Sequence, residues 1–179
     1  MSNEPTIAIS GKSGCGNSTV SRIVAERLGL NLINYTFKSI AAERGMTFEK
    51  VCRLAETDDS YDRYVDERQV KLAAKGHCVL GSRLAIWLLS KSDLTIYLNA
   101  PLSVRSQRIS EREGGELEQV TSETAERDSR DRQRYIRLYD IDIDQFDFAD
   151  MIVSADDATQ FEIAELIIER VRSIDTNQN

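Results

Sequence analysis

A glycine-rich loop between an apolar strand and an amphipathic helix constrains the fold more than any other feature of this sequence. The strand is the β-branched run Thr6–Ile9, and a glycine-rich segment begins at Gly11. Beyond that segment, apolar residues repeat at helical spacing until Gly29 ends the helix; they are Val20, Ile23, Val24 and Leu28. A buried strand that passes through glycines into a helix predicts the opening unit of an α/β sheet.

The rest of the chain continues to alternate short apolar strands with helices. Further strands are predicted at 31–33, 78–80, 94–98 and 151–153. Helices are predicted at roughly 36–43, 47–56, 58–75, 102–113, 117–139 and 161–171. This order predicts a three-layer α/β fold, with a five-stranded parallel sheet and helices on both faces. Because 179 residues suffice for one core, we expect a single domain over residues 1–179.

Composition excludes several classes of protein. The net charge of −7 argues against nucleic-acid binding, which favours a basic surface. The three cysteines have no C-x-x-C spacing, and His77 is the only histidine, so neither a disulfide framework nor a zinc site is expected. His77 also lacks a matching nucleophile, so we interpret it as structural. The sequence shows neither a secretion signal nor a long apolar run, which predicts a cytoplasmic protein without membrane contact.

The glycine segment matches a phosphate-binding loop of the form G-x-x-x-x-G-K-[ST] at all but one position. Gly11 and Gly16 have the required separation, and Ser18 supplies the hydroxyl. Glycines let backbone amides point at anionic oxygens, and the following helix N-terminus adds roughly half a positive charge. Ser18 could complete the shell of a magnesium ion. Asn17 replaces the lysine, and the alternative is a glycine-rich turn that binds nothing.

With this loop placed, the sequence resembles the nucleoside monophosphate kinases, and most of all the short cytidylate kinases of the archaeal type. The resemblance spans roughly residues 7–171, and the loop in that family reads G-x-x-G-x-G-[KT]-T-T, so the loss of the lysine has precedent. It implies a P-loop kinase fold that phosphorylates CMP or dCMP, with ATP and Mg²⁺ as cofactors.

The resemblance assigns the donor nucleotide to the glycine loop and to one later helix. The donor phosphates would be held by Gly11, Lys12, Ser13, Gly14, Cys15, Gly16, Asn17, Ser18 and Thr19, with Ser18 on the metal. Arg108 would stack on the adenine, and Arg112, one turn further on, would reach the phosphates. Cys15 lies at a helix N-terminus, which would lower its thiol pKa, although it also fits simply as a small residue.

The acceptor nucleotide is assigned to helices at about 34–75 and to the segment after the third strand. Lys38 and Arg83 match basic residues that hold the acceptor phosphate, and Asp131 resembles a residue that helps hold its sugar. Gly81 departs from the family, which has an acidic residue there that organises the metal's water shell. Because the site lacks both this carboxylate and the loop lysine, we hypothesise that Lys12 supplies the missing positive charge.

A lid at about 108–139, hinged at Gly114-Gly115, carries the most specific match after the loop. Arg127-Asp128-x-x-Asp131-x-x-Arg134 fits the signature R-D-x-x-D-x-x-R, and eight arginines lie between residues 105 and 137. Arg127 and Arg134 would stabilise the transferred phosphoryl group. The alternative is a solvated helix with ion pairs at i, i+4, namely Glu123–Arg127, Glu126–Arg130 and Asp128–Arg132.

Some features leave two readings open. Asp62 and Asp66 share a helix face, which is either solvated or in contact with the acceptor nucleoside. Asp140, Asp142 and Asp144 suggest a calcium loop, but Gln145 and Met151 break the EF-hand pattern. The functional alternatives are a nucleotide-binding module with weak or lost catalysis and a kinase for AMP or UMP. In every case the expected partners are small nucleotides, and the expected state is a monomer.

Overall fold

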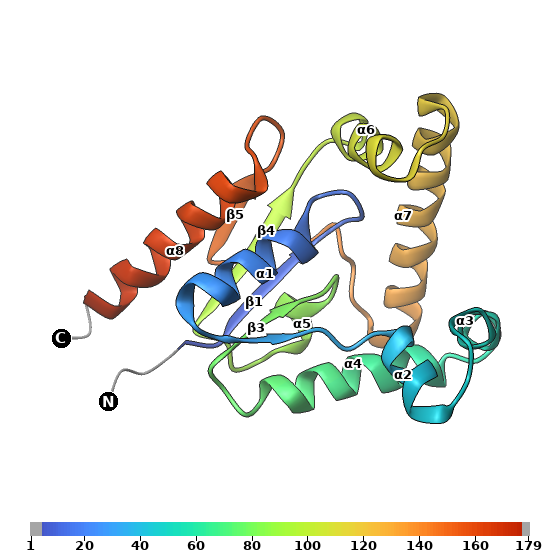
Figure 1. Cartoon of the computed structure of the whole chain (residues 1–179), viewed down its shortest axis with the longest axis horizontal. Coiled ribbons are helices and arrows are strands. Elements are labelled where there is room, and N and C mark those ends of the chain that lie inside the picture. Colours follow the sequence, from blue (N-terminus) through green and yellow to red (C-terminus); the bar gives the residue numbers. More distant parts are fainter. Residues whose placement is uncertain (1–4, 177–179) are drawn as a thin grey trace.

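The computed structural model describes residues 5–176 and contains a five-stranded parallel sheet in the order β2-β3-β1-β4-β5. The strands are β1 (Ile7–Gly11), β2 (Asn31–Ile33), β3 (Cys78–Gly81), β4 (Leu94–Asn99) and β5 (Met151–Ser154). Figure 1 shows the sheet at the centre of the molecule, with helices on both sides. The predicted α/β fold is therefore confirmed.

Successive side chains along each strand point to opposite faces of the sheet, so the apolar strands supply core residues on both faces. Ile7 and Ile9 of β1 pack on one face, where α1 (Asn17–Leu28) and α8 (Gln160–Thr176) cover them. Ala8 and Tyr97 lie on the opposite face, where they meet α4 (Ser60–Ala73) and α5 (Ala85–Leu88). Since successive side chains of a strand point to opposite faces, a strand buried on both faces needs this continuous apolar sequence.

The remaining helices lie beyond the sheet, toward the carboxyl ends of its strands (Figure 1). α2 (Phe37–Arg44) starts at a capping box of Thr36 and Ser39, and α3 (Phe48–Ala55) starts at Thr47, whose hydroxyl accepts a hydrogen bond from the Lys50 amide. Both helices share a small core with α4. α6 (Leu102–Glu113) and α7 (Leu117–Tyr139) pack on each other, and the C-terminal half of α7 contacts α4.

The predicted elements agree with the observed ones to within a few residues at each end. The one helix that periodicity did not predict is α5, whose four residues fall in the short apolar run after Arg83. That run is too short for a helical repeat to show, and burial of Ala85 and Ile86 stabilises it. No helix within residues 5–176 is both long and apolar enough to span a bilayer.

Candidate active site

The glycine loop forms the wall of a cavity of about 260 Å³ at the carboxyl ends of β1 and β3. Gly14 has a left-handed φ of 85°, and a Cβ there would lie 2.7 Å from the carbonyl oxygen of Arg105. The loop therefore needs glycine at this position in order to approach α6. The cavity is lined by Gly11, Lys12, Ser13, Gly14, Gly16, Asn17, Ser18, Thr19, Gly81, Ser82, Arg83 and Arg112.

The side chain at position 17 binds the protein's own backbone. The Asn17 amide Nδ2 donates to the carbonyl oxygen of Ile9 at 3.2 Å, and the Ser21 hydroxyl donates to Asn17 Oδ1 at 3.0 Å. A Cβ at residue 81 would lie 2.7 Å from Ser21 Cβ and 3.2 Å from Asn17 Oδ1. Asn17, Ser21 and Gly81 thus form one packed unit, and both departures from the family pattern belong to it.

Lys12 is the cation of the loop itself. Its side chain lines the cavity, and its ammonium Nζ lies 2.5 Å from a carboxylate oxygen of Asp144. Asp144 belongs to the connector after α7 and also contacts Arg132 Nε at 3.2 Å. Lys12 is therefore held beside the phosphate loop by an ion pair that an anionic ligand could replace.

A second cavity of about 240 Å³ lies between α2, α4 and the C-terminal half of α7. Its walls combine aromatic, apolar and acidic side chains with Ser82 and Arg83, which also line the first cavity. The two cavities therefore meet at Arg83. The second is lined by Tyr35, Thr36, Phe37, Asp62, Val65, Asp66, Gln69, Ser82, Arg83, Leu84 and Tyr135.

A row of ion pairs runs from Arg83 along this second cavity. Arg83 pairs with Asp131, Asp131 accepts a hydrogen bond from Arg134 Nη2 at 3.1 Å, and Arg134 Nη1 lies 3.6 Å from Asp62. Asp131 and Asp62 are both buried. Two of the predicted site residues on α7, Asp131 and Arg134, thus pair with residues that line the second cavity.

The acidic face of α4 lines the second cavity and is not the solvated face that its composition allowed. Burial raises the pKa of the Asp62 carboxyl, and it raises the pKa of Asp66 to about 6. The Tyr139 hydroxyl donates to Asp66 Oδ2 at 2.6 Å. Gln69 completes the face and donates to the Tyr35 carbonyl oxygen at 2.7 Å. The i, i+4, i+7 spacing of these three residues was the signal available in the sequence.

A buried arginine that the sequence did not single out ties α7 to the glycine loop. Arg105 is 4% exposed, binds Asp128 through both Nη1 (3.3 Å) and Nη2 (2.6 Å), and donates to the Ser13 carbonyl oxygen at 3.1 Å. Asp128 therefore pairs with Arg105, and Arg132 pairs instead with Asp142 and Asp144. Each residue of the predicted i, i+4 pair Asp128–Arg132 thus has ion-pair partners farther away in the sequence.

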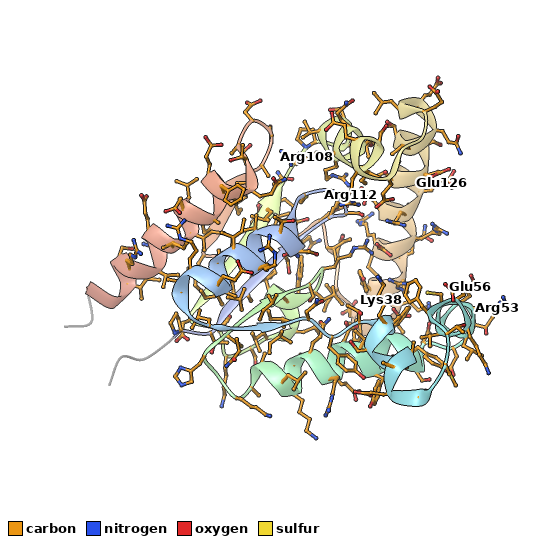
Figure 2. All side chains as sticks on the ribbon, in the orientation of Figure 1. Lys38, Arg53, Glu56, Arg108, Arg112 and Glu126 are labelled. Carbon is orange, nitrogen blue, oxygen red and sulfur yellow. The ribbon has the colours of Figure 1, made fainter. Side chains whose placement is uncertain are left out.

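The three remaining arginines of the predicted site, Arg108, Arg112 and Arg127, lie in different surroundings. Arg127 Nη1 donates to the Ser13 hydroxyl at 3.3 Å, and Arg112 lines the first cavity beside Glu113. Arg108 Nη2 donates to the carbonyl oxygen of Ala155 at 2.6 Å, in the loop between β5 and α8. Figure 2 shows Arg108 and Arg112 close to each other near the glycine loop. Arg108 is thus bound to main chain beside the cavity, outside its lining.

Two predicted residues have surroundings that differ from the expectation. Lys38 is exposed, with Nζ 5.7 Å from the centre of the Phe48 ring, and it does not line the second cavity. Figure 2 shows it beside α2, well apart from Arg108 and Arg112. Cys15 is buried beneath the loop, and burial raises the pKa of its thiol, so the expected lowering by the helix N-terminus is wrong.

Comparisons of the sequence with known proteins point to one family. The profile of the Cytidylate kinase-like family matches residues 6–157. "Cytidylate kinase 2" of Borreliella afzelii is 45% identical over 169 residues, which cover 92% of this chain and 95% of the relative. "Cytidylate kinase" of Archaeoglobus fulgidus is 38% identical over 168 residues, covering 92% of this chain and 93% of the relative.

Solved structures with the same fold include kinases of other small molecules. A shikimate kinase from Acinetobacter baumannii, in complex with shikimate, superposes with a TM-score of 0.65 at 19% identity, covering 96% of this chain and 95% of the other. A deoxyadenosine kinase from M. mycoides with bound dATP gives 0.58 at 17% identity, covering 93% and 98%. At these identities the likeness concerns the fold alone.

Proposed function

Because the chain belongs to the cytidylate kinase-like family, we propose that it transfers the γ-phosphoryl group of ATP to CMP or dCMP. The observation that carries the proposal is the pair of cavities that meet at Arg83. One is lined by the phosphate-type glycine loop, and the other has the aromatic and polar walls that suit a nucleoside. The relatives named cytidylate kinase supply the identity of the acceptor.

On the donor side, backbone amides from Gly11 to Thr19 and the N-terminus of α1 would hold the triphosphate, with Lys12 and Arg112 as cations. Asn17 would act on the loop and not on the nucleotide, because Ile9 and Ser21 occupy its amide. Arg108 would need to exchange a carbonyl partner in order to stack on adenine.

Mg²⁺ fits this site only as a companion of ATP. No cluster of three or more histidine, cysteine or acidic side chains suited to a metal occurs in the part of the chain that the structure describes. The exposed hydroxyl of Ser18 lines the first cavity, and Mg²⁺ commonly keeps waters and phosphate oxygens around one such protein ligand. Ser18 would therefore hold the ion, which when bound neutralises part of the phosphate charge.

On the acceptor side, Arg83 would bind the phosphate, since it lies where the two cavities join, and its ion-pair partner Asp131 would bind the sugar. Lys38 would have to leave the Phe48 ring to reach that phosphate. The transferred group breaks its bond to the β-phosphate oxygen of ATP and forms a bond to an anionic oxygen of the acceptor phosphate. Because that oxygen already carries charge, no general base is needed, and catalysis consists of alignment and charge neutralisation.

The lid would contribute the arginines that neutralise this charge. Arg127 contacts Ser13 of the glycine loop and would approach the donor phosphates from α7. Arg134 lies between Asp131 and Asp62 and would act after exchanging a carboxylate for the phosphoryl group. Three cysteines without disulfides support a reducing, cytoplasmic compartment.

A panel of monophosphates offered with Mg-ATP tests the proposal. We expect diphosphate formation from CMP and dCMP at a kcat/KM well above that for UMP or AMP. A kinase for another acceptor would show a different preference across the same panel. Tight ATP binding without turnover of any acceptor would instead identify a nucleotide-binding module and contradict the proposal.

A further inference from the structure

The second cavity contains two buried polar atoms without a partner among the described residues. They are Oδ2 of Asp62 and the hydroxyl oxygen of Ser82. The Asp62 side chain is only 10% exposed, and Arg134 Nη1 lies 3.6 Å from its other oxygen. A buried carboxylate oxygen without a donor is costly, so this position favours a ligand that brings an N–H or O–H group.

The row of ion pairs separates Arg83, where we place the acceptor phosphate, from Asp62 in the second cavity. Arg83 and Asp62 both line the second cavity and stand at the two ends of the row, whose middle residues, Asp131 and Arg134, connect them outside its lining. A nucleotide whose phosphate lies at Arg83 therefore extends its sugar and then its base toward Asp62. Tyr35, Phe37 and Tyr135 line the same cavity and offer aromatic surface for a planar ring.

Resting on the function proposed above, we propose that Asp62 determines base specificity by accepting a hydrogen bond from the exocyclic amine of the acceptor's base. Cytosine presents an amino donor at position 4, whereas uracil presents a carbonyl acceptor there. A carboxylate oxygen pairs with the amine and repels the carbonyl oxygen. Asp62 thus both rewards an amino pyrimidine and rejects its keto counterpart.

The competing role for Asp62 is a hydrogen bond to a sugar hydroxyl. That role would act equally on cytidine and uridine monophosphates, because their sugars are identical. It would also be indifferent to the amino group at position 4. The base and the sugar can therefore be separated by changing the ligand at one atom.

The test is a cycle that pairs Asp62→Ala with a CMP analogue whose base, pyrimidin-2-one, lacks the 4-amino group. Dissociation constants are measured by calorimetry for both ligands and both proteins. Loss of the amine should weaken binding to the unmodified protein by about tenfold or more. The same loss should have little effect on Asp62→Ala, which has no side-chain acceptor, because the two changes remove one interaction. Independent effects that simply multiply would overturn the proposal.

Kinetics provide the second readout and the controls. Asp62→Asn should reduce the CMP-over-UMP ratio of kcat/KM by about tenfold or more, and Asp62→Glu should restore part of it. Equal losses for CMP and UMP would indicate the sugar role and contradict the proposal. Glu67→Gln, on an exposed position of α4 outside the cavity, is the matched control.

Two outcomes separate this inference from the proposed function. If the unmodified protein phosphorylates no monophosphate, the function itself fails. If it phosphorylates CMP but binds CMP and the analogue equally, only the role of Asp62 fails. This last comparison needs no variant, so it holds even where the Asp62 variants do not fold.

Discussion

At residue 17 a neutral amide points into the protein, so the phosphate loop depends on other groups for its positive charge. Asn17 is engaged by Ile9 and Ser21, and Gly81 leaves the space that the Ser21 side chain fills. The loss of a lysine and the loss of an acid are therefore coupled sterically as well as electrostatically. Lys12 is the lysine of the loop that lines the cavity.

Replacing Lys12 by alanine tests whether this residue compensates for Asn17. We expect Lys12→Ala to lower kcat/KM for ATP by about 10- to 100-fold, because a charge-assisted hydrogen bond to phosphate is lost. Lys12→Arg keeps the charge and should retain most of the activity. Steady-state kinetics with varied ATP measure the effect, and unchanged kinetics for Lys12→Ala would show that the loop needs no side-chain cation from residue 12.

At the scale of elements, helix α7 is connected to the glycine loop. Arg105 on α6 links Asp128 on α7 with the Ser13 carbonyl oxygen, and Arg127 contacts the Ser13 hydroxyl. Because Arg105 is buried, it needs Asp128 as a counter-charge. These contacts of Arg105 with Asp128 and with the Ser13 carbonyl oxygen form a brace, which holds the glycine loop and α7 against α6.

Removing the carboxylate of this brace should destabilise the fold. Asp128→Asn leaves a buried guanidinium without its anion, and we expect a loss of about 2–3 kcal/mol in the free energy of unfolding. Arg132→Ala on the same helix breaks an exposed pair with Asp142 and should cost less than about 1 kcal/mol. Denaturant unfolding compares the two variants, and equal small losses would show that the brace does not hold the loop.

The elements themselves could be predicted from the sequence because their apolar spacing is local. The partners of individual side chains could not. The pairing of Arg105 with Asp128 joins residues 23 positions apart on two helices, and no periodicity records it. Likewise, the spacing of Asp62, Asp66 and Gln69 showed a shared face, but only the packing of α4 against α2 and α7 turns that face into a cavity wall.

Motif matching assigned basic residues along the chain but could not tell where each side chain lies in space. Arg83 and Arg112 line the first cavity, and Asp131 pairs with Arg83 without lining either cavity. Lys38 instead lies over Phe48, and Arg108 binds carbonyl oxygens of the loop before α8. Long side chains choose among several nearby partners, and that choice depends on tertiary neighbours that a linear pattern does not contain.

At the scale of the whole molecule, the sheet brings the two cavities together. β1 and β3 are neighbouring parallel strands, so β1 ends at Gly11 and β3 ends at Gly81 on the same edge of the sheet. The segments that follow these two strands line the adjoining cavities. This is where open α/β sheets commonly bind ligands. We infer that one cavity takes the donor and the other the acceptor, with Arg83 at the point of transfer.

A single ligand that spans both cavities tests this claim most directly. Adenosine and cytidine joined through their 5′-oxygens by a chain of five phosphates should bind about 100-fold or more tightly than ATP or CMP alone. Calorimetry should also show that it excludes both nucleotides. Binding no tighter than that of ATP, with CMP still able to bind beside it, would contradict the account.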